Sequence, residues 1–255
     1  MHRISILIIL TSLGVGCAAD SGDESFIIRS NVAAPTEGTC EFTPDVNAQA
    51  LSRGQLSLFS KNPYVLHALF QSRIVAPEGK ESQRTVFLKG ADVSVVVGPI
   101  EMIDAEGNVT TDAVEETLPG FQSVFTGALN PNGGLLVAEF DVVPLAALAS
   151  IRARAGGAVT IHAQVQTTAT PFGDYYGAEL RGAPFQFPVT VCNDCVVSPV
   201  VDDQGAPVNC PLVMGTVPRL GNPCNPYQDG IVDCCNDTGG PVCPAPVSIL
   251  PPPTP

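Results

Sequence analysis

The stretch Val159-Thr-Ile-His-Ala-Gln-Val-Gln166 decides the fold class of this chain. Apolar and polar residues alternate at every second place, so one side of an extended strand would enter a core and the other would face water. The same period of two recurs in LVAEFDV (136–142) and in FQFPVTV (185–191). A helix would instead place its apolar residues three and four apart, so the middle of the chain is predicted to be β.

Working outward from this stretch, further strand candidates lie at 56–60, 64–75, 85–97 and 121–129, separated by Gly, Pro and Asn turns. Regular short strands with such turns predict a mostly β fold, an antiparallel Ig-like β-sandwich of about seven or eight strands over 45–191. Pro188 should lie at an edge or a bulge, because it has no N–H to donate. The Ala-rich segment 145–154 is the exception and predicts a short helix across one end of the sandwich.

The N-terminus carries a short apolar run, residues 4–15, which is too short for a lasting membrane span but has the length of a signal-peptide core. It ends in Leu13-Gly-Val-Gly-Cys17, which resembles the lipobox of bacterial lipoproteins, with the usual Leu one place early. In that family the signal peptide is cut before the Cys, which then carries acyl chains such as palmitate. The resemblance implies a lipidated Cys17, and Ala18 in place of Asp implies the outer membrane of the cell envelope. An ordinary signal peptide cut near Ala18 and an uncleaved anchor are the alternatives.

Composition divides the rest of the chain. Residues 1–16 are the expected signal peptide, 17–44 a lipidated Cys with a flexible acidic tether, 45–191 the sandwich, 192–243 a disulfide-rich module and 244–255 a Pro-rich extended tail. The apolar residues Phe26, Ile27 and Ile28 interrupt this tether, and the alternative is that they pack on the domain.

Cysteine usage predicts cross-links. Leaving Cys17 aside, eight of the nine cysteines remain, an even number typical of disulfides in an oxidising compartment: Cys40, Cys192, Cys195, Cys210, Cys224, Cys234, Cys235 and Cys243. Seven of them lie between 192 and 243, so complete pairing requires Cys40 to bond to one of these seven. The adjacent Cys234 and Cys235 should take different partners, because a ring between neighbours is strained. The full connectivity stays open.

Two alternatives remain for the cysteines. Cys192-Asn-Asp-Cys195 has the two-residue gap of a zinc knuckle, but no second such pair follows it. The same pair in a thioredoxin-like redox role would need a βαβ context, which the pattern lacks.

The charge is strongly acidic. Without the first 16 residues, 11 basic and 25 acidic side chains leave a net charge of −14. Such a surface repels phosphate backbones and anionic lipid, so nucleic acid is excluded as a partner and contact with a membrane should be through the acyl chains on Cys17. Trp is absent, which argues against the aromatic platforms that many sugar-binding modules use.

No motif for catalysis is found. A Ser–His–Asp set would have to use His67 or His162, each expected to be an ordinary strand residue. The carboxylate pairs Glu115-Glu116 and Asp202-Asp203 would point to opposite sides of an extended chain. A weak calcium candidate is the set Asp229, Asp233 and Asp237, whose carboxylates lie near the cysteines; no other cofactor is expected.

The sequence therefore predicts a lipid-anchored, non-enzymatic envelope protein with a structural, adhesive or partner-binding role, its partner an envelope protein or a polysaccharide. Two other classes stay open. One is a secreted hydrolase with carboxylate or calcium chemistry on the sandwich loops. The other is an assembly or cargo-binding lipoprotein with an apolar cavity.

Overall fold

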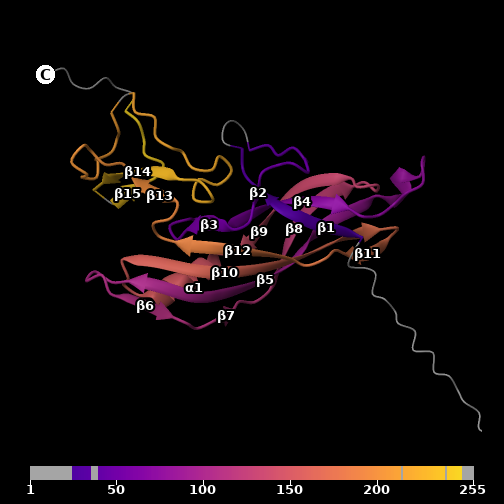
Figure 1. Cartoon of the computed structure of the whole chain (residues 1–255), viewed down its shortest axis with the longest axis horizontal. Helices are drawn as coiled ribbons and strands as arrows, with labels where there is room; N and C mark the ends of the chain where they lie inside the picture. Colours follow the sequence, from indigo (N-terminus) through magenta and orange to yellow (C-terminus); the bar gives the residue numbers. More distant parts are fainter. Residues whose placement is uncertain (1–24, 36–39, 214, 239, 249–255) are drawn as a thin grey trace, which may run out of the picture.

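The computed structural model describes residues 25–35, 40–213, 215–238 and 240–248 (Figure 1). It is mostly β, with two sheets that form a sandwich and a third, small sheet near the C-terminus. Cys17, the signal peptide and the Pro-rich tail from 249 onward lie outside the described residues.

The first sheet has the strand order β2-β1-β4-β9. Strand β4 (Tyr64–Ser72) pairs on one side with the edge strand β9 (Leu135–Val143), and the two run antiparallel from Tyr64↔Val143 to Gln71↔Leu135. On the other side of β4 lies β1 (Phe26–Val32), followed by the short β2 (Ala50–Leu51).

The second sheet is built on two long strands, β5 (Val86–Ile103) and β10 (Thr160–Tyr175). They pair antiparallel from Thr160↔Ile103 to Asp174↔Phe87. The other edge of β5 is taken in turn by β8 (Phe121–Leu129), β7 (Glu116–Thr117) and β6 (Val109–Asp112).

The other edge of β10 pairs with β12 (Phe185–Cys192) and, at its far end, with the hairpin strand β11 (Ala178–Arg181). Beyond β12 lies β3 (Gly54–Ser57), which runs parallel to it. Pro188 lies just before the first β12–β3 pair, Val189↔Gly54, so its missing N–H leaves no ladder bond unmade.

The core lies between the two sheets and follows the predicted alternation. Ile161, Ala163 and Val165 are buried, whereas Gln164 and Gln166 between and after them are exposed. Phe125 and Phe140 stack at its centre with their rings 4.7 Å apart.

The expected helix is α1 (Leu145–Ala155), with a short 3-10 turn, η2 (Glu81–Arg84), elsewhere. Helix α1 starts after Pro144, which is itself in an extended conformation. The helix closes one end of the sandwich with a buried stripe of Ala147, Leu148, Ile151 and Ala155. Arg154 fixes its last turn, because its guanidinium bonds the Asp112 carboxylate at 2.8 Å.

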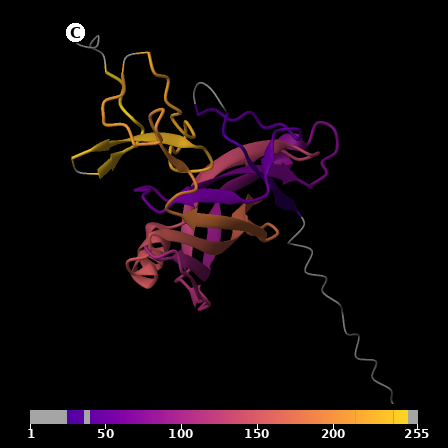
Figure 2. The same cartoon turned by 60° about the vertical axis from the view of Figure 1, so that its left-hand side comes forward.

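The C-terminal module holds β13 (Val197–Pro199), β14 (Val232–Asp237) and β15 (Gly240–Val242), and it projects from the β3 and β12 side of the sandwich (Figures 1 and 2). Its own apolar cluster is small, with Leu212, Cys235 and Ala245 at its centre. Disulfides cross-link the module: Cys210–Cys235, Cys234–Cys243 and, at its entry, Cys192–Cys195. The fourth disulfide, Cys40–Cys224, spans 184 positions and joins the module to the segment before β2. The sandwich with a disulfide-rich region is thus confirmed.

Several expectations need correction. The flexible tether cannot extend to residue 44, because β1 is an integral strand with Phe26 fully buried. The sheets are not wholly antiparallel, since β3 runs parallel to β12 and β13 runs parallel to β14. The strand expected to reach Val75 ends at Ser72, and Val159 is 58% exposed because the alternating strand starts one residue later.

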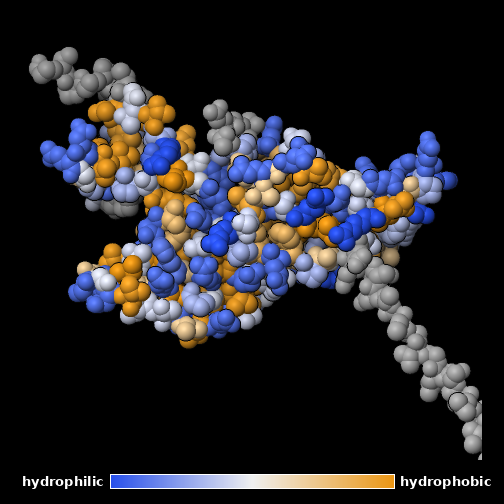
Figure 3. All heavy atoms as spheres, viewed as in Figure 1, coloured by the Kyte–Doolittle hydropathy of each residue, from blue (hydrophilic) through white to orange (hydrophobic). Residues whose placement is uncertain are grey.

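No helix in the described part of the chain is both long and apolar enough to cross a membrane. On the face shown in Figure 3, polar and apolar residues are interspersed over the sandwich.

The two-sheet core predicts a large difference between two phenylalanines. Phe140→Ala should lower the free energy of unfolding by about 3–5 kcal/mol, because it removes a buried ring and leaves a cavity beside Phe125. Phe87→Ala, at a position 57% exposed, should change it by about 0.5 kcal/mol or less. Urea unfolding with the disulfides intact measures both, and equal losses would contradict this assignment of the core.

Candidate functional site

The cysteines that resemble a zinc knuckle are bonded to each other. Cys192 and Cys195 form a disulfide that closes a tight loop at the end of β12. Asn193 in this loop bonds both the Val159 carbonyl and the Ile161 N–H, so the loop is fixed to the start of β10. His162 follows on the same strand, half exposed, with its Nε2 2.7 Å from Asp194. His162 is thus a half-exposed histidine in contact with Asp194, and the contacts of the described residues place no nucleophile beside it.

The carboxylates singled out by sequence have separate structural roles. Glu116 bonds Ser150 of α1, while Asp202 accepts two backbone N–H groups within its own turn, from Gln204 and Ala206. Glu115 and Asp203 are exposed. Each pair therefore supports local structure instead of converging on one point.

The three calcium candidates are not gathered. Asp229 is bonded to Tyr64, Asp233 pairs with Arg219 at 2.6 Å, and Asp237 accepts the N–H of Thr238. Within the described ranges, one group of three metal-ligating side chains has its ligand atoms within 4.8 Å of one another, and it is Cys40, His67 and Cys224.

Asp229 instead belongs to a buried polar joint between the module and the sandwich. Its Oδ2 accepts the Tyr64 hydroxyl at 2.6 Å, and its Oδ1 accepts the Gln55 N–H at 2.7 Å. The neighbouring Gln228 is fully buried and bonds both the N–H and the carbonyl of Val65, as a strand partner would. A Cβ on Gly54 would lie 2.5 Å from the Tyr64 ring, so only glycine fits this close approach.

Burial sets the protonation of this joint. It raises the pKa of Asp229 above the ordinary aspartate value, although the hydrogen bonds from Tyr64 and Gln55 offset part of this effect. The pKa of Tyr64 is also raised, first by burial and then by the nearby charge of Asp229. The joint thus prefers a protonated Tyr64 and disfavours an ionised Asp229.

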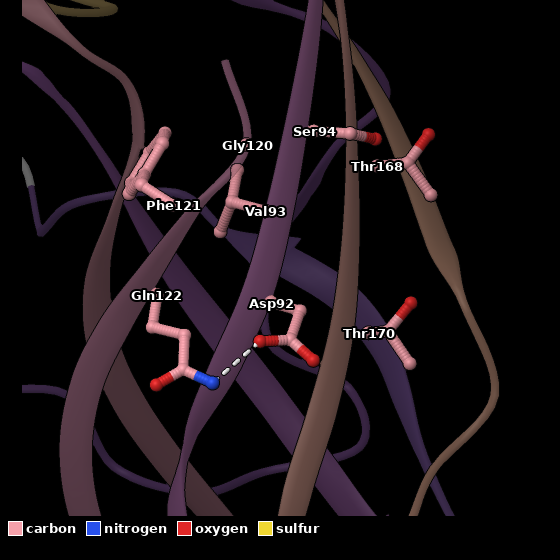
Figure 4. A pocket seen from close by; sticks show the side chains of 8 residues that line it. All are labelled: Asp92, Val93, Ser94, Gly120, Phe121, Gln122, Thr168 and Thr170. Atoms are coloured by element: carbon pink, nitrogen blue, oxygen red, sulfur yellow. Dashed lines mark hydrogen bonds between the residues drawn. The ribbon is translucent and has the colours of Figure 1, made fainter.

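A second feature is an open groove of about 480 Å³ on the outer face of the second sheet (Figure 4). It crosses three neighbouring strands, β8, β5 and β10. Its lining is Asp92, Val93, Ser94, Gly120, Phe121, Gln122, Thr168 and Thr170. Register explains the gathering, since Gln122, Asp92 and Thr170 are direct cross-strand partners and Ser94 is opposite Thr168.

The groove carries little net charge. Asp92 is its one carboxylate among the lining residues, and it is paired with Arg181 of β11 at 2.5 Å and with the Gln122 amide at 2.9 Å. The hydrogen bond from Arg181 is the main reason why the pKa of Asp92 is lowered. The groove therefore offers hydroxyls, an amide and a neutralised carboxylate to a ligand.

The sequence indicated neither the groove nor the environment of His67. The polar positions of 92, 94, 168 and 170 are visible in the alternation, but only the register brings them together. The alternation places His67 on the side of its strand opposite to Leu66 and Ala68, yet all three residues are buried and His67 is 1% exposed. Phe42 stacks on its imidazole at 4.2 Å and covers it.

Comparison with known proteins adds no assignment. No family model matches the chain, and no curated protein matches it.

Asp229 of the polar joint and Asp92 of the groove have pKa values shifted in opposite directions, so they predict pH dependences of opposite sign. Because the pKa of Asp229 is raised in the folded protein, its contribution to stability is full below the unfolded value, about 3.9, and is lost as the pH rises through the folded one. The stability of wild type relative to Asp229→Asn should therefore fall as the pH rises. For Asp92→Asn the relative stability of wild type should rise with pH, because the pKa of Asp92 is lowered.

Urea unfolding of the three proteins at pH values from 3 to 7 measures both differences. Parallel pH profiles for wild type and Asp229→Asn would contradict the prediction, because they would show that folding does not raise the pKa of Asp229.

Proposed function

We propose that this protein is a lipid-anchored, non-enzymatic component of the cell envelope that binds an uncharged polysaccharide in the groove of Figure 4. The observation that carries the binding role is the groove itself, with its row of hydrogen-bonding side chains across three rigid strands.

The cysteine pairing supports the anchored location. Eight of the nine cysteines form four disulfides, typical of an exported protein, and the ninth is Cys17 of the lipobox-like stretch. An odd cysteine at the end of a signal-like segment is the position that lipidation uses. Ala18 after it favours the outer membrane.

The chemistry of the groove favours binding over hydrolysis. A glycosidase needs two carboxyl groups across the scissile bond, but Asp92 is the one carboxylate among the groove's lining residues and it is held by Arg181. Hydroxyl and amide groups match the hydroxyls of a sugar chain. The acidic net charge of the protein disfavours an anionic polymer, so the partner should be neutral.

One observation favours a second role, the binding of an apolar cargo. A cavity of about 450 Å³ lies where the sandwich meets the module, with Phe59, Val197 and Val242 among its lining residues. Its size is that of a small-molecule site. Its lining also includes Lys61 and Asn236, so an amphiphilic ligand would suit it better than a pure hydrocarbon.

The anchor gives a direct prediction. The membrane-extracted protein should begin at Cys17, carry acyl chains and have no free thiol before reduction. Cys17→Ser should remove the lipid and leave the protein uncleaved. Intact mass before and after reduction and alkylation checks this, and a lipid-free mature protein that starts after Cys17 would show an ordinary signal peptide.

The groove gives a second prediction. Thr168→Arg should weaken binding to a neutral polysaccharide fraction from the cell's own envelope by about tenfold or more, equivalent to about 1.4 kcal/mol, because it fills the groove. Gln164→Arg is the matched control: it adds the same charge on the same face of β10, outside the groove, and should leave binding unchanged.

Biolayer interferometry with the immobilised protein measures both variants. Equal binding by wild type and Thr168→Arg would contradict the assignment of the groove, whatever the fate of Cys17.

A further inference from the structure

A histidine lies beside the two cysteines of the long-range disulfide, so three side chains with metal-binding chemistry are close together. Cys40 comes from the segment before β2, Cys224 from the C-terminal module, and His67 from the middle of β4. Their ligand atoms, two sulfurs and an imidazole nitrogen, all lie within 4.8 Å of one another. No element of the proposed polysaccharide site takes part, so a role for these three side chains is independent of that function.

His67 is held in place, but one of its two ring nitrogens has no hydrogen-bond partner among the described residues. Its backbone N–H donates to Asn31 Oδ1 at 2.9 Å, and its imidazole stacks on Phe42. The side chain is 1% exposed, and its Nε2 has no hydrogen-bond partner among the described residues. A buried nitrogen without a hydrogen-bond partner is unfavourable for a fold, and a bound ligand would remove that cost. Burial lowers the pKa of His67 to about 4.

The Cys40–Cys224 disulfide is also the easiest of the four to reach. Each of the other three contains a buried cysteine: Cys192, Cys235 or Cys234. Neither Cys40 nor Cys224 is in the buried core. A reductant in solution should therefore open this bridge first.

We propose that reduction of the Cys40–Cys224 disulfide creates a binding site for a thiophilic d¹⁰ cation, Zn²⁺ or Cu⁺, with Cys40, Cys224 and His67 as its ligands. A dithiol supplies two electrons and two protons, is oxidised to its own disulfide, and leaves two thiols. The cation then binds both sulfurs as thiolates and releases their two protons.

The ligand set fits these ions. Two thiolates and one imidazole are soft and borderline donors, which select Zn²⁺ and Cu⁺ over Ca²⁺ or Mg²⁺. Glu139, the cross-strand partner of His67 on β9, has its Oε1 4.0 Å from Cys40 Sγ, so a carboxylate is at hand for a fourth position. The ion would keep the module attached to the sandwich after the disulfide is opened, since its ligands come from both.

The test uses the purified mature protein under anaerobic conditions. A phosphine replaces the dithiol, because dithiols themselves bind zinc, and differential alkylation with peptide mapping shows which bridge has opened. Zn²⁺ and Cu⁺ are then titrated separately against a chromophoric competitor. We expect Cys40 and Cys224 to be alkylated first, and one equivalent of at least one of the two ions to bind the reduced protein and none the oxidised protein. Co²⁺ in place of Zn²⁺ should give thiolate-to-cobalt charge-transfer absorption.

His67→Gln separates a metal site from a mere pair of thiols. Loss of a ligand's hydrogen-bond partner alone weakens metal binding by about 10- to 100-fold, so loss of the ligand should weaken it by at least about tenfold. His162→Gln, the same change at the half-exposed histidine of β10, should bind as wild type does. If His67→Gln fails to fold, judged by thermal unfolding of the oxidised form, the Cys40→Ser/Cys224→Ser double variant replaces it and should bind neither ion.

Three results would overturn the site: no stoichiometric binding of either ion, unchanged affinity in His67→Gln, or a different disulfide opening first.

Discussion

The antiparallel pairing of β5 with β10 is the constraint on which the remaining structure depends. These strands of 18 and 16 residues pair along almost their whole length, with register shifts between Ala163 and Val165 and between Phe172 and Gly173. Five further strands attach directly to one or the other. Because side chains alternate along a strand, a slip of one residue would turn Val93, Val95 and Val97 out of the core. The burial of these three valines therefore fixes the register of β5, and this register positions the strands that pair with β5 and β10.

The same pairing produces the groove on the other face of the sheet. Asp92 and Ser94 lie on either side of the buried Val93, so they must point outward, and the register places Thr170 and Thr168 beside them. The hairpin β10–β11 then brings Arg181 over Asp92, which neutralises the one carboxylate of the lining. A groove of this kind needs no ordering of a loop, because the sheet already holds its side chains in place.

The sequence predicted what depends on local periodicity and left open what depends on distant packing. The alternation at 159–166 predicted a strand and its buried face, and the Ala-rich run predicted α1, because both signals repeat within a few residues. The odd count of cysteines from residue 192 onward required the link to Cys40 for complete pairing, but only the fold selects Cys224. The parallel β3 and the burial of His67 carry no local signal.

His67 illustrates why such features escape prediction from the sequence. In the period-two pattern of β4, the His67 side chain points away from the sandwich core, on the side opposite to Leu66 and Ala68. The imidazole is buried by Phe42 and by the Cys40–Cys224 disulfide, which belong to two other parts of the chain. A strand pattern reports which side faces the sandwich core, and it is silent about what later packs on the opposite side.

The position of β1 decides how an anchored molecule would be oriented. Phe26 begins this strand nine residues after Cys17. Nine residues span at most about 32 Å when fully extended, so a lipid on Cys17 would keep this end of the sandwich close to the membrane. Phe26 lies beside the chain that leaves β11, since its carbonyl accepts the Ala183 N–H, and Arg181 of that strand borders the groove. The C-terminal module lies toward the opposite end (Figure 1). An anchored protein would therefore hold its groove on the membrane-proximal half and present the disulfide-linked module, with its accessible Cys40–Cys224 bridge, to the compartment beyond.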